Sequence, residues 1–196
     1  AESVLDGLQA CNLPEHEFRI VYPEDFRHAS HRFYRKTQAD LERLGFRLVG
    51  DIQDATISAV WPARPTFIRT MVDRNETTVA SFYHIKVRLP WRILIILLRT
   101  PTTGVDLESY TRCGRTYCTT TVPESMFVPS PVSIAKDSAP RSTRIDDLYG
   151  RHRRTLEAGG SRGELVRIRG ISDVIDYQKR QRREIYQHLQ QIGWAT

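Results

Sequence analysis

The segment TFIRTMVDRNETTVASFYHIKV, residues 66–87, decides how this sequence is expected to fold. Two runs rich in β-branched and aromatic residues, 66–72 and 77–87, flank the polar tetrapeptide 73–76. Runs of this kind on either side of a short polar turn predict two antiparallel strands joined in a hairpin. The segment therefore predicts an antiparallel sheet.

Further strand signals lie on both sides of this hairpin. The run Ile93–Leu98 lacks alternation, so we expect it to be buried on both faces of the sheet. Two later runs flank Cys113 and Gly114, where glycine supplies the backbone freedom of a second hairpin turn. Besides the two strands of the first hairpin, we expect four more, at residues 46–52, 93–98, 105–112 and 116–121. The sequence thus predicts six antiparallel strands.

Three helices complete the expected fold. Residues from about 23 to Gly45 carry apolar positions near the helical period, and Gly45 supplies a stop. A second helix is expected from Ser142 or Thr143 to Ala158, and a third from Ser172 to near Gly193. The fold class is therefore α+β, with a mostly antiparallel sheet of about six strands and three helices packed on it.

The domain organisation is expected to be simple. Residues 1–22 are interpreted as an N-terminal arm or tail, and residues 23–196 as a single α+β domain. The proline- and serine-rich stretch 122–142 is expected to be a long crossing loop. The residues expected in the core are Phe46, Leu48, Ile95, Leu97 and Leu107.

Composition excludes several classes of protein. The chain has 196 residues, of which 40% are hydrophobic and 27% charged, as in an ordinary globular domain. Its longest apolar run has six residues, whereas a membrane-spanning helix needs about 20. Three cysteines cannot form a secreted disulfide framework, which favours a reducing compartment such as the cytoplasm. Because the sequence starts at Ala1, a removed upstream segment would also allow a membrane-peripheral place.

The cysteines are expected to be free thiols. Counting across the second hairpin predicts that Cys118 lies opposite Ser109 rather than Cys113. A disulfide needs Cα atoms about 4.4–6.8 Å apart, and this register does not bring Cys113 and Cys118 together. Cys11 is expected to be free or to pair with one of the other two.

The net charge of +6 is concentrated in the last third of the chain, where residues 136–196 hold 13 Lys or Arg against 8 Asp or Glu. Residues 178–184, the middle of the final helix, are polar on every side of the helix. This part is therefore not expected to pack into a core. Two interpretations stay open, a solvated helix with arginine stems along its edge and a docking surface. The basic residues of the second interpretation are Lys179, Arg180, Arg182, Arg183, Arg151, Arg153 and Arg154.

The docking interpretation gives the first functional hypothesis. The protein would be a non-catalytic interaction module, a subunit of a larger or membrane-associated assembly that binds an acidic protein through its basic C-terminal helix. Anionic lipid and nucleic acid are weaker alternatives as partners, and the role of a nucleic-acid accessory protein is a separate hypothesis. Few aromatic residues near the basic cluster could stack on bases, which disfavours nucleic acid.

One weak metal-site candidate is present near the first expected helix. Glu24, His28 and His31 fall at i, i+4 and i+7, so a continuous helix would place them on one stripe. Two imidazoles and a carboxylate suit zinc, but only the spacing supports this site. A solvated polar face is the competing interpretation, so no metal is assigned.

The alternative functional hypothesis is a small hydrolase-like enzyme that uses an Asp/His pair. Acid–base catalysis needs two titratable groups within hydrogen-bond reach and in different environments. The sequence contains no nucleophile elbow, zinc-protease motif, phosphate-binding loop or dinucleotide fingerprint, so no cofactor and no catalytic residue are assigned. The titratable candidates are Asp51, Asp73, Glu108 and His152.

A resemblance to a bacterial protein family rests on an ordered series of short motifs. These are the helix-to-strand motif Leu41-x-x-Leu44-Gly45-Phe46 with Gly50-Asp51, then Thr119-Thr120-Thr121, then Leu148-x-x-x-His152. The chain is similar to this family over roughly residues 31–190. Family members have Asp-Gly at the second hairpin turn and Thr-Thr-Asn after it, where this chain has Cys113 and Thr121. The family has no known activity, so the resemblance implies none.

Overall fold

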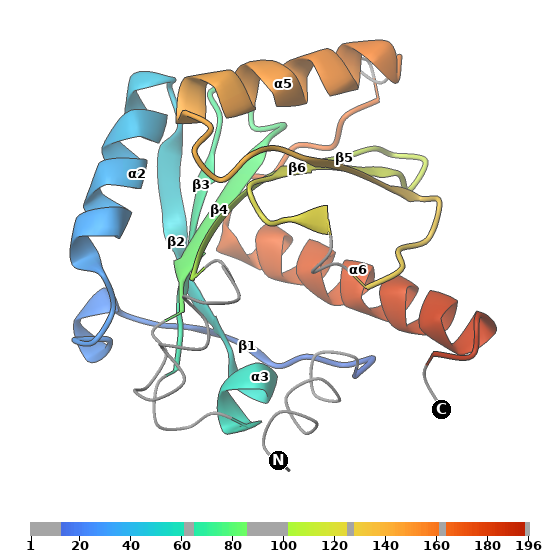
Figure 1. Ribbon diagram of the computed structural model, residues 1–196, viewed down its shortest axis with the longest axis horizontal. Coiled ribbons are helices and arrows are strands. Elements are labelled where there is room, and N and C mark those ends of the chain that lie inside the picture. The colour runs from blue at the N-terminus through green and yellow to red at the C-terminus, as the bar shows by residue number, and fades with distance from the viewer. Residues whose placement is uncertain (1–12, 61–64, 86–101, 125–127, 161–163, 195–196) are drawn as a thin grey trace.

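The computed structural model describes residues 13–60, 65–85, 102–124, 128–160 and 164–194. These residues form one α+β fold around a single seven-stranded sheet, which confirms the predicted fold class (Figure 1). The strands follow one another in the order β1-β2-β3-β4-β5-β6-β7, antiparallel except for the parallel pair β6 and β7. Their bounds are β1 Phe18–Ile20, β2 Arg47–Asp54, β3 Ile68–Val72, β4 Val79–His84, β5 Thr103–Tyr110, β6 Thr116–Thr120 and β7 Ile134–Ser138.

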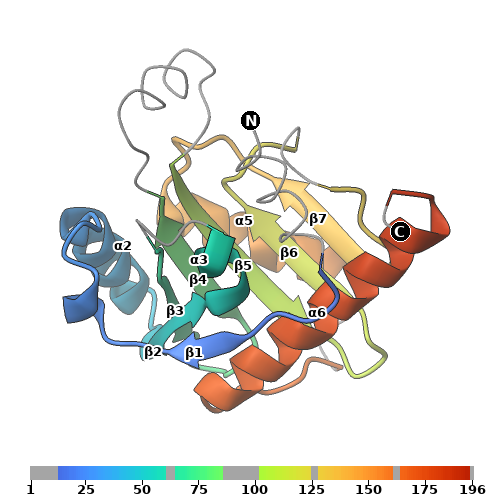
Figure 2. The ribbon, with the colours of Figure 1, turned by 90° about the horizontal axis from the view of Figure 1, so that it is seen from below.

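Helices cover both faces of the sheet. In Figure 1, α5 runs above strands β5 and β6 and α6 runs below them, with α2 at the side of the β2–β4 end. Figure 2, seen from the α6 side, shows this helix crossing over the strands. The elements are α2 (His31–Arg43), α5 (Ile145–Ala158), α6 (Ile171–Gln191), the short helix α3 (Ala55–Val60) and the 3₁₀ turn η1 (Pro23–Asp25).

The face covered by α2 and α5 carries the larger hydrophobic core. Alternate residues of β3, β4 and β5 point to this face, among them Met71, Phe82 and Leu107, none of which is exposed to solvent. From α2, the Tyr34 ring stacks on Phe67 with centroids 4.2 Å apart. The Tyr34 hydroxyl donates a hydrogen bond of 2.8 Å to the Phe67 carbonyl, so its polar end is satisfied although it is buried.

The face covered by α6 carries a smaller core. It gathers Ile52, Val72 and Val79 from the sheet with Val174 from the first turns of α6. The Tyr110 ring on β5 stacks on Tyr177 of α6 with centroids 4.3 Å apart. Beyond this core, towards β7, the same face of the sheet is polar.

The elements differ from the sequence-based expectations at several places. Stretch 122–142, predicted as a loop, contains the edge strand β7, which pairs with β6 alone in the described part of the chain. The first helix begins at His31 rather than near Pro23, because Pro23–Asp25 form a separate 3₁₀ turn. Residues 18–20 of the predicted arm form the edge strand β1.

The predicted core was correct at two positions and wrong at one. Phe46 and Leu107 are 4% and 0% exposed, whereas Leu48 is 44% exposed. A β-bulge follows Leu48, and its extra residue, Val49, packs against the core under α6. The predicted strand at 93–98, with Ile95 and Leu97, lies outside the described residues. Among the described helices, none combines the length and apolar character that crossing a bilayer requires.

Candidate functional site

Small polar residues form a row across the α6-facing side of the sheet. Ser81 on β4 lies opposite Asp106 on β5, which lies opposite Thr120 on β6, which lies opposite Ser138 on β7. Cross-strand partners on one face have Cβ atoms about 4.5–5.5 Å apart, so these side chains are neighbours. Short side chains along this row leave Asp106 as its one charged member.

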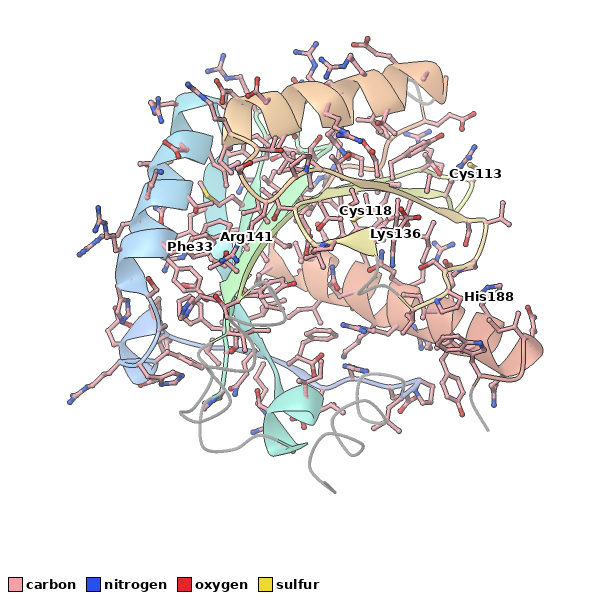
Figure 3. The ribbon with its side chains drawn as sticks, viewed as in Figure 1. Phe33, Cys113, Cys118, Lys136, Arg141 and His188 are labelled. Atoms are coloured by element: carbon pink, nitrogen blue, oxygen red, sulfur yellow. The ribbon has the colours of Figure 1, made fainter. Side chains whose placement is uncertain are left out.

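A second row lies beside the first, two residues away on each strand. It places Glu108 of β5 opposite Cys118 of β6, and Cys118 opposite Lys136 of β7. Figure 3 shows Cys118 and Lys136 on the side of the sheet that faces α6. The two rows therefore bring two carboxyl groups, a thiol and an amine onto one sheet face.

Glu108 joins this sheet face to α6. Its Oε2 accepts hydrogen bonds from the Tyr110 hydroxyl at 2.7 Å and from Gln178 Nε2 at 2.9 Å, and its Oε1 accepts one from Gln181 Nε2 at 3.3 Å. As expected, no residue of 178–184 is fully buried in a hydrophobic core, but this part of α6 lies against the sheet rather than free in solvent. The surface it packs on is itself polar, so the glutamine side chains find partners there.

The Asp106 carboxyl has a strongly raised pKa. Its Oδ1 accepts a hydrogen bond from the Thr120 hydroxyl. The pKa of the Asp106 carboxyl is raised to about 7, chiefly because the group is removed from water. The hydrogen bond from Thr120 and the charge of Lys136 oppose this shift, and the negative charge of Glu108 adds to it. The residue as a whole is partly buried, and a carboxyl group with this pKa exchanges its proton near neutral pH.

Lys136 is shifted in the sense that favours its neutral form. Burial lowers the pKa of the Lys136 amine, and the positive charge of Arg182 on α6 lowers it as well. Cys118, Glu108 and Asp106 act in the opposite direction without cancelling this effect. An acid with a raised pKa thus lies on the same sheet face as a base with a lowered one.

Tyr83 and Arg182 complete the cluster. Burial raises the pKa of the Tyr83 hydroxyl, the negative charge of Asp106 raises it as well, and the positive charge of Arg182 lowers it. Its ring lies against Gly104 of β5, where a Cβ atom would meet the ring and hydroxyl at 2.6 Å. Glycine at position 104 is therefore required for the place that Tyr83 takes. We call Tyr83, Asp106, Glu108, Cys118, Lys136 and Arg182 the polar cluster.

The cysteines are free, as predicted for Cys113 and Cys118, but the hairpin register differs by one residue. Cys118 lies opposite Glu108, and Ser109 lies opposite Tyr117. The predicted two-residue turn was too short, because the strands end at Tyr110 and begin again at Thr116. Burial raises the pKa of the Cys118 thiol well above its usual range, with Glu108 and Asp106 adding to the effect. The thiolate is thereby disfavoured.

The two described thiols are expected to differ in reactivity. The experiment uses a Cys11→Ser variant, so that only Cys113 and Cys118 remain. Cys113 is exposed and should react with Ellman's reagent at the rate of a solvent-exposed thiol. Cys118, buried and held as a thiol, should react about 100-fold more slowly until the protein unfolds. Release of thionitrobenzoate from Cys113→Ser and Cys118→Ser variants measures both rates. Equal rates in folded protein would mean that α6 does not cover Cys118.

An Asp/His pair holds the N-terminal segment to the sheet. The buried His16 Nδ1 lies 2.6 Å from Asp54 Oδ2, and the backbone N–H of Ile57 donates to Asp54 Oδ1. His16 Nε2 is buried and has no hydrogen-bond partner in the described part of the structure. The ring stacks against Phe18, which belongs to the core under α6. The pair thus lies on the α6-facing side of the sheet, at its β1–β2 end.

The predicted titratable candidates do not come together. His152 of α5 is buried on the opposite face, between the hydroxyls of Ser109 and Thr119, each 3.0 Å from a ring nitrogen. Burial lowers the pKa of His152 to about 4, so the ring stays neutral at pH 7. Asp51 forms a bidentate pair with Arg69 on β3.

Asp73, in the hairpin turn, accepts hydrogen bonds from the backbone N–H groups of Thr77 and Thr78. Such bonds fix a turn and are typical of a structural aspartate. Glu108 is thus the only one of the four predicted candidates that belongs to the polar cluster.

The metal-site candidate is not assembled. Glu24 lies in the 3₁₀ turn η1, His28 lies between this turn and α2, and His31 is the first residue of α2. The His28 Nε2–H donates to the Pro65 carbonyl at 2.8 Å. The chain bends between the three residues, so no common helical stripe exists. Within the described ranges, no group of three His, Cys, Asp or Glu side chains could hold a metal ion.

The predicted partner-binding residues lie on two helices that cover opposite faces of the sheet (Figure 1). Arg151 on α5 forms an ion pair of 2.5 Å with Asp137 on β7, and Arg180 on α6 forms one of 3.0 Å with Glu184. Arg182 belongs to the polar cluster and is half-buried. Exposed side chains are left at Lys179, Arg180 and Arg183 on α6 and at Arg153 and Arg154 on α5.

Two neighbouring arginines of α6 provide a matched pair of variants. Arg182→Glu would place a third carboxylate beside Asp106 and Glu108, and we expect it to cost about 2 kcal/mol and lower Tm by about 4–8 °C. Arg183→Glu alters an exposed side chain and should change the free energy of unfolding by less than about 0.5 kcal/mol. Thermal unfolding followed by circular dichroism measures both. Equal effects would mean that Arg182 does not face the sheet.

Sequence reasoning missed Asp106, Tyr83 and Lys136. The alternation of Asp106 and Glu108 within a predicted strand was a usable signal, since it places two carboxylates on one face of a sheet. Lys136 lay in the stretch predicted as a loop, so nothing in the sequence connected it with β5. The cross-strand register was needed to bring these residues together.

The fold and the cluster define an α+β protein with a polar, titratable sheet face under its last helix. Comparison with known proteins finds no matching family model, no similar curated protein and no similar solved structure. The resemblance to a bacterial family therefore stays a prediction.

Proposed function

We propose that the protein is a small enzyme that performs acid–base chemistry on a small polar molecule bound at the polar cluster. The observation that carries this proposal is the half-buried Asp106, whose pKa of about 7 lets it donate and accept protons at physiological pH. Opposed shifts of an acid and a base on one surface are typical of catalytic sites.

Each member of the cluster has a role in this proposal. Asp106 exchanges the proton with the substrate. Arg182 stabilises negative charge that develops on the substrate, because it is a cation held in a partly buried position, and the Lys136 amine lies on the same sheet face. Ser81 and Thr120, beside Asp106, offer hydroxyl groups for hydrogen bonds that orient a polar ligand.

A second proposal is the interaction module that docks an acidic partner through α6. Its support is the exposure of Lys179, Arg180 and Arg183 on this helix. We favour the enzyme for two reasons. Arg180 already forms an ion pair with Glu184, and the basic residues of α5 and α6 lie on opposite faces of the sheet, so they do not form one surface. Co-purification that is lost on reversing Lys179, Arg180 and Arg183 to Glu would instead favour docking.

The experiment that tests the enzyme proposal is a ligand screen on the wild type and on two Asp→Asn variants, one at Asp106 and one at a control position. Small α-keto acids, aldoses, hydroxy acids and amino acids are tested for an increase in Tm, since a ligand at 100 times its Kd stabilises by about 2.7 kcal/mol. The stabilisation should persist in Asp176→Asn, which alters an exposed acid of α6, and disappear in Asp106→Asn. Compounds that bind should then exchange a carbon-bound hydrogen for deuterium in D₂O, observed by NMR.

Two outcomes would overturn the proposal. One is that no compound of the panel stabilises the protein. The other is that every stabilising compound acts equally on Asp106→Asn, which would place its binding elsewhere.

A further inference from the structure

We propose that the Lys136 amine forms an imine with the carbonyl group of a small aldehyde or ketone, in the polar cluster between the sheet and α6. This inference rests on the proposed function and names its substrate class as carbonyl compounds. It follows from the residue type at position 136, its neighbours across the strands and the proton-exchanging group beside them.

The residue type is informative because this chain uses lysine sparingly. Its 29 basic residues comprise 25 arginines and only Lys36, Lys86, Lys136 and Lys179. Among the described residues, Lys36 and Lys179 are exposed, and Lys136 is the half-buried one. A guanidinium cannot lose its proton in a protein, whereas a buried amine can and then becomes a nucleophile.

The neighbours of Lys136 fit a nucleophilic amine. The strand register places Cys118 beside it and Glu108 beyond Cys118, and Asp106 lies on the same face two residues from Glu108. From α6, Arg182 approaches with a positive charge. Burial and this charge both lower the pKa of the amine, so more of it is neutral at pH 7–8 than at an exposed lysine.

The chemistry balances with groups of this site. The neutral nitrogen attacks the carbonyl carbon, and its proton passes to the carbonyl oxygen to give a carbinolamine. Protonated Asp106 then gives its proton to the hydroxyl, which leaves as water while the nitrogen lone pair forms the C=N bond. The products are a protonated imine and the Asp106 carboxylate, whose opposite charges attract. A group with a pKa of about 7 can supply this proton and take it back at neutral pH.

The experiment traps the imine by reduction. The full chain is incubated at pH 7 with pyruvate or glyceraldehyde and sodium cyanoborohydride, and the modified lysines are located by peptide mass mapping. We expect Lys136 to be modified about 100-fold faster than Lys36 or Lys179. Lys36→Arg should leave the labelling unchanged, whereas Lys136→Arg and Lys136→Met should abolish it while retaining the native circular dichroism spectrum.

The outcomes separate this inference from the function on which it rests. Labelling spread over the lysines in proportion to their exposure, or absent from Lys136, overturns the imine. If ligands nevertheless stabilise the protein through Asp106, the acid–base function stands without it. Labelling at Lys136 that is equally fast in Asp106→Asn supports the imine and overturns the role of Asp106.

Discussion

Replacing Phe82 by alanine is expected to lower the free energy of unfolding by about 3–5 kcal/mol, the range for a large aromatic side chain removed from a packed core. Phe82 lies on β4 and is 0% exposed. It contacts Phe33 and Tyr34 of α2, with ring centroids 6.2 and 5.8 Å apart. The cavity would therefore open where α2 meets the sheet, and urea denaturation followed by circular dichroism measures the loss.

Ile20→Ala is the control for this change. Ile20 lies on the edge strand β1 and is 61% exposed, so its truncation should cost less than about 0.5 kcal/mol. A loss below about 1 kcal/mol for Phe82→Ala would contradict the packing of α2 on β4. The comparison also separates core packing from a general weakening of the sheet.

Asp106→Asn is expected to stabilise the protein at pH 8. A pKa raised from 3.8 to about 7 corresponds to about 4 kcal/mol at 1.36 kcal/mol per unit. Because the residue as a whole is only partly buried, solvent screening reduces this value, and we expect a gain of about 1–3 kcal/mol. Asparagine keeps an oxygen that accepts from Thr120 but carries no charge, so the cost of burying the carboxylate disappears.

The pH dependence of this gain has a definite sign. The folded-state pKa of Asp106 lies above its unfolded value, so its favourable contribution is full below about pH 4 and is lost as pH rises through about 7. Asp106→Asn should thus gain stability at pH 8 and gain little at pH 4. Urea denaturation of both proteins at pH 4, 6 and 8 measures this difference. If Asp106→Asn were less stable than the wild type by the same amount at all three pH values, the prediction would be contradicted.

His152 acts in the opposite direction and provides an internal check. Its pKa is lowered to about 4, so its contribution is full above about pH 6.5 and is lost as pH falls towards 4. The free energy of unfolding of the wild type depends on pH through both groups. In Asp106→Asn the loss of stability above neutral pH should disappear, and the loss at acid pH should remain. A residue that destabilises its own fold at neutral pH is typical of a functional site.

The sequence predicted the fold class because most elements carry a local signal. The hairpin at residues 66–87 and the helix ending at Ala158 follow from periodicity and turn residues, and the structure places β3, β4 and α5 there. Strand β7 carried no such signal. Its residues, IAKDS, do not alternate between apolar and polar, and only pairing with β6 makes them a strand.

The candidate site could be predicted only in part for a related reason. Glu108 was recognised as titratable in the sequence. The pKa of Asp106, however, depends on Thr120, Glu108 and Lys136, which come from three different strands. Their proximity is a matter of register, and the predicted register of the second hairpin was wrong by one residue. An error of one residue turns every side chain of a strand to the other face.

The central claim is that Asp106 exchanges a proton near neutral pH in the folded protein. The most direct test is ¹³C NMR of the side-chain carboxyl groups in uniformly labelled protein, with the Asp106 signal assigned by comparison with Asp106→Asn. We predict a titration midpoint near pH 7 for Asp106, well above that of an exposed aspartate. A midpoint near 4 would contradict the claim, because the carboxyl would then be permanently ionised at physiological pH.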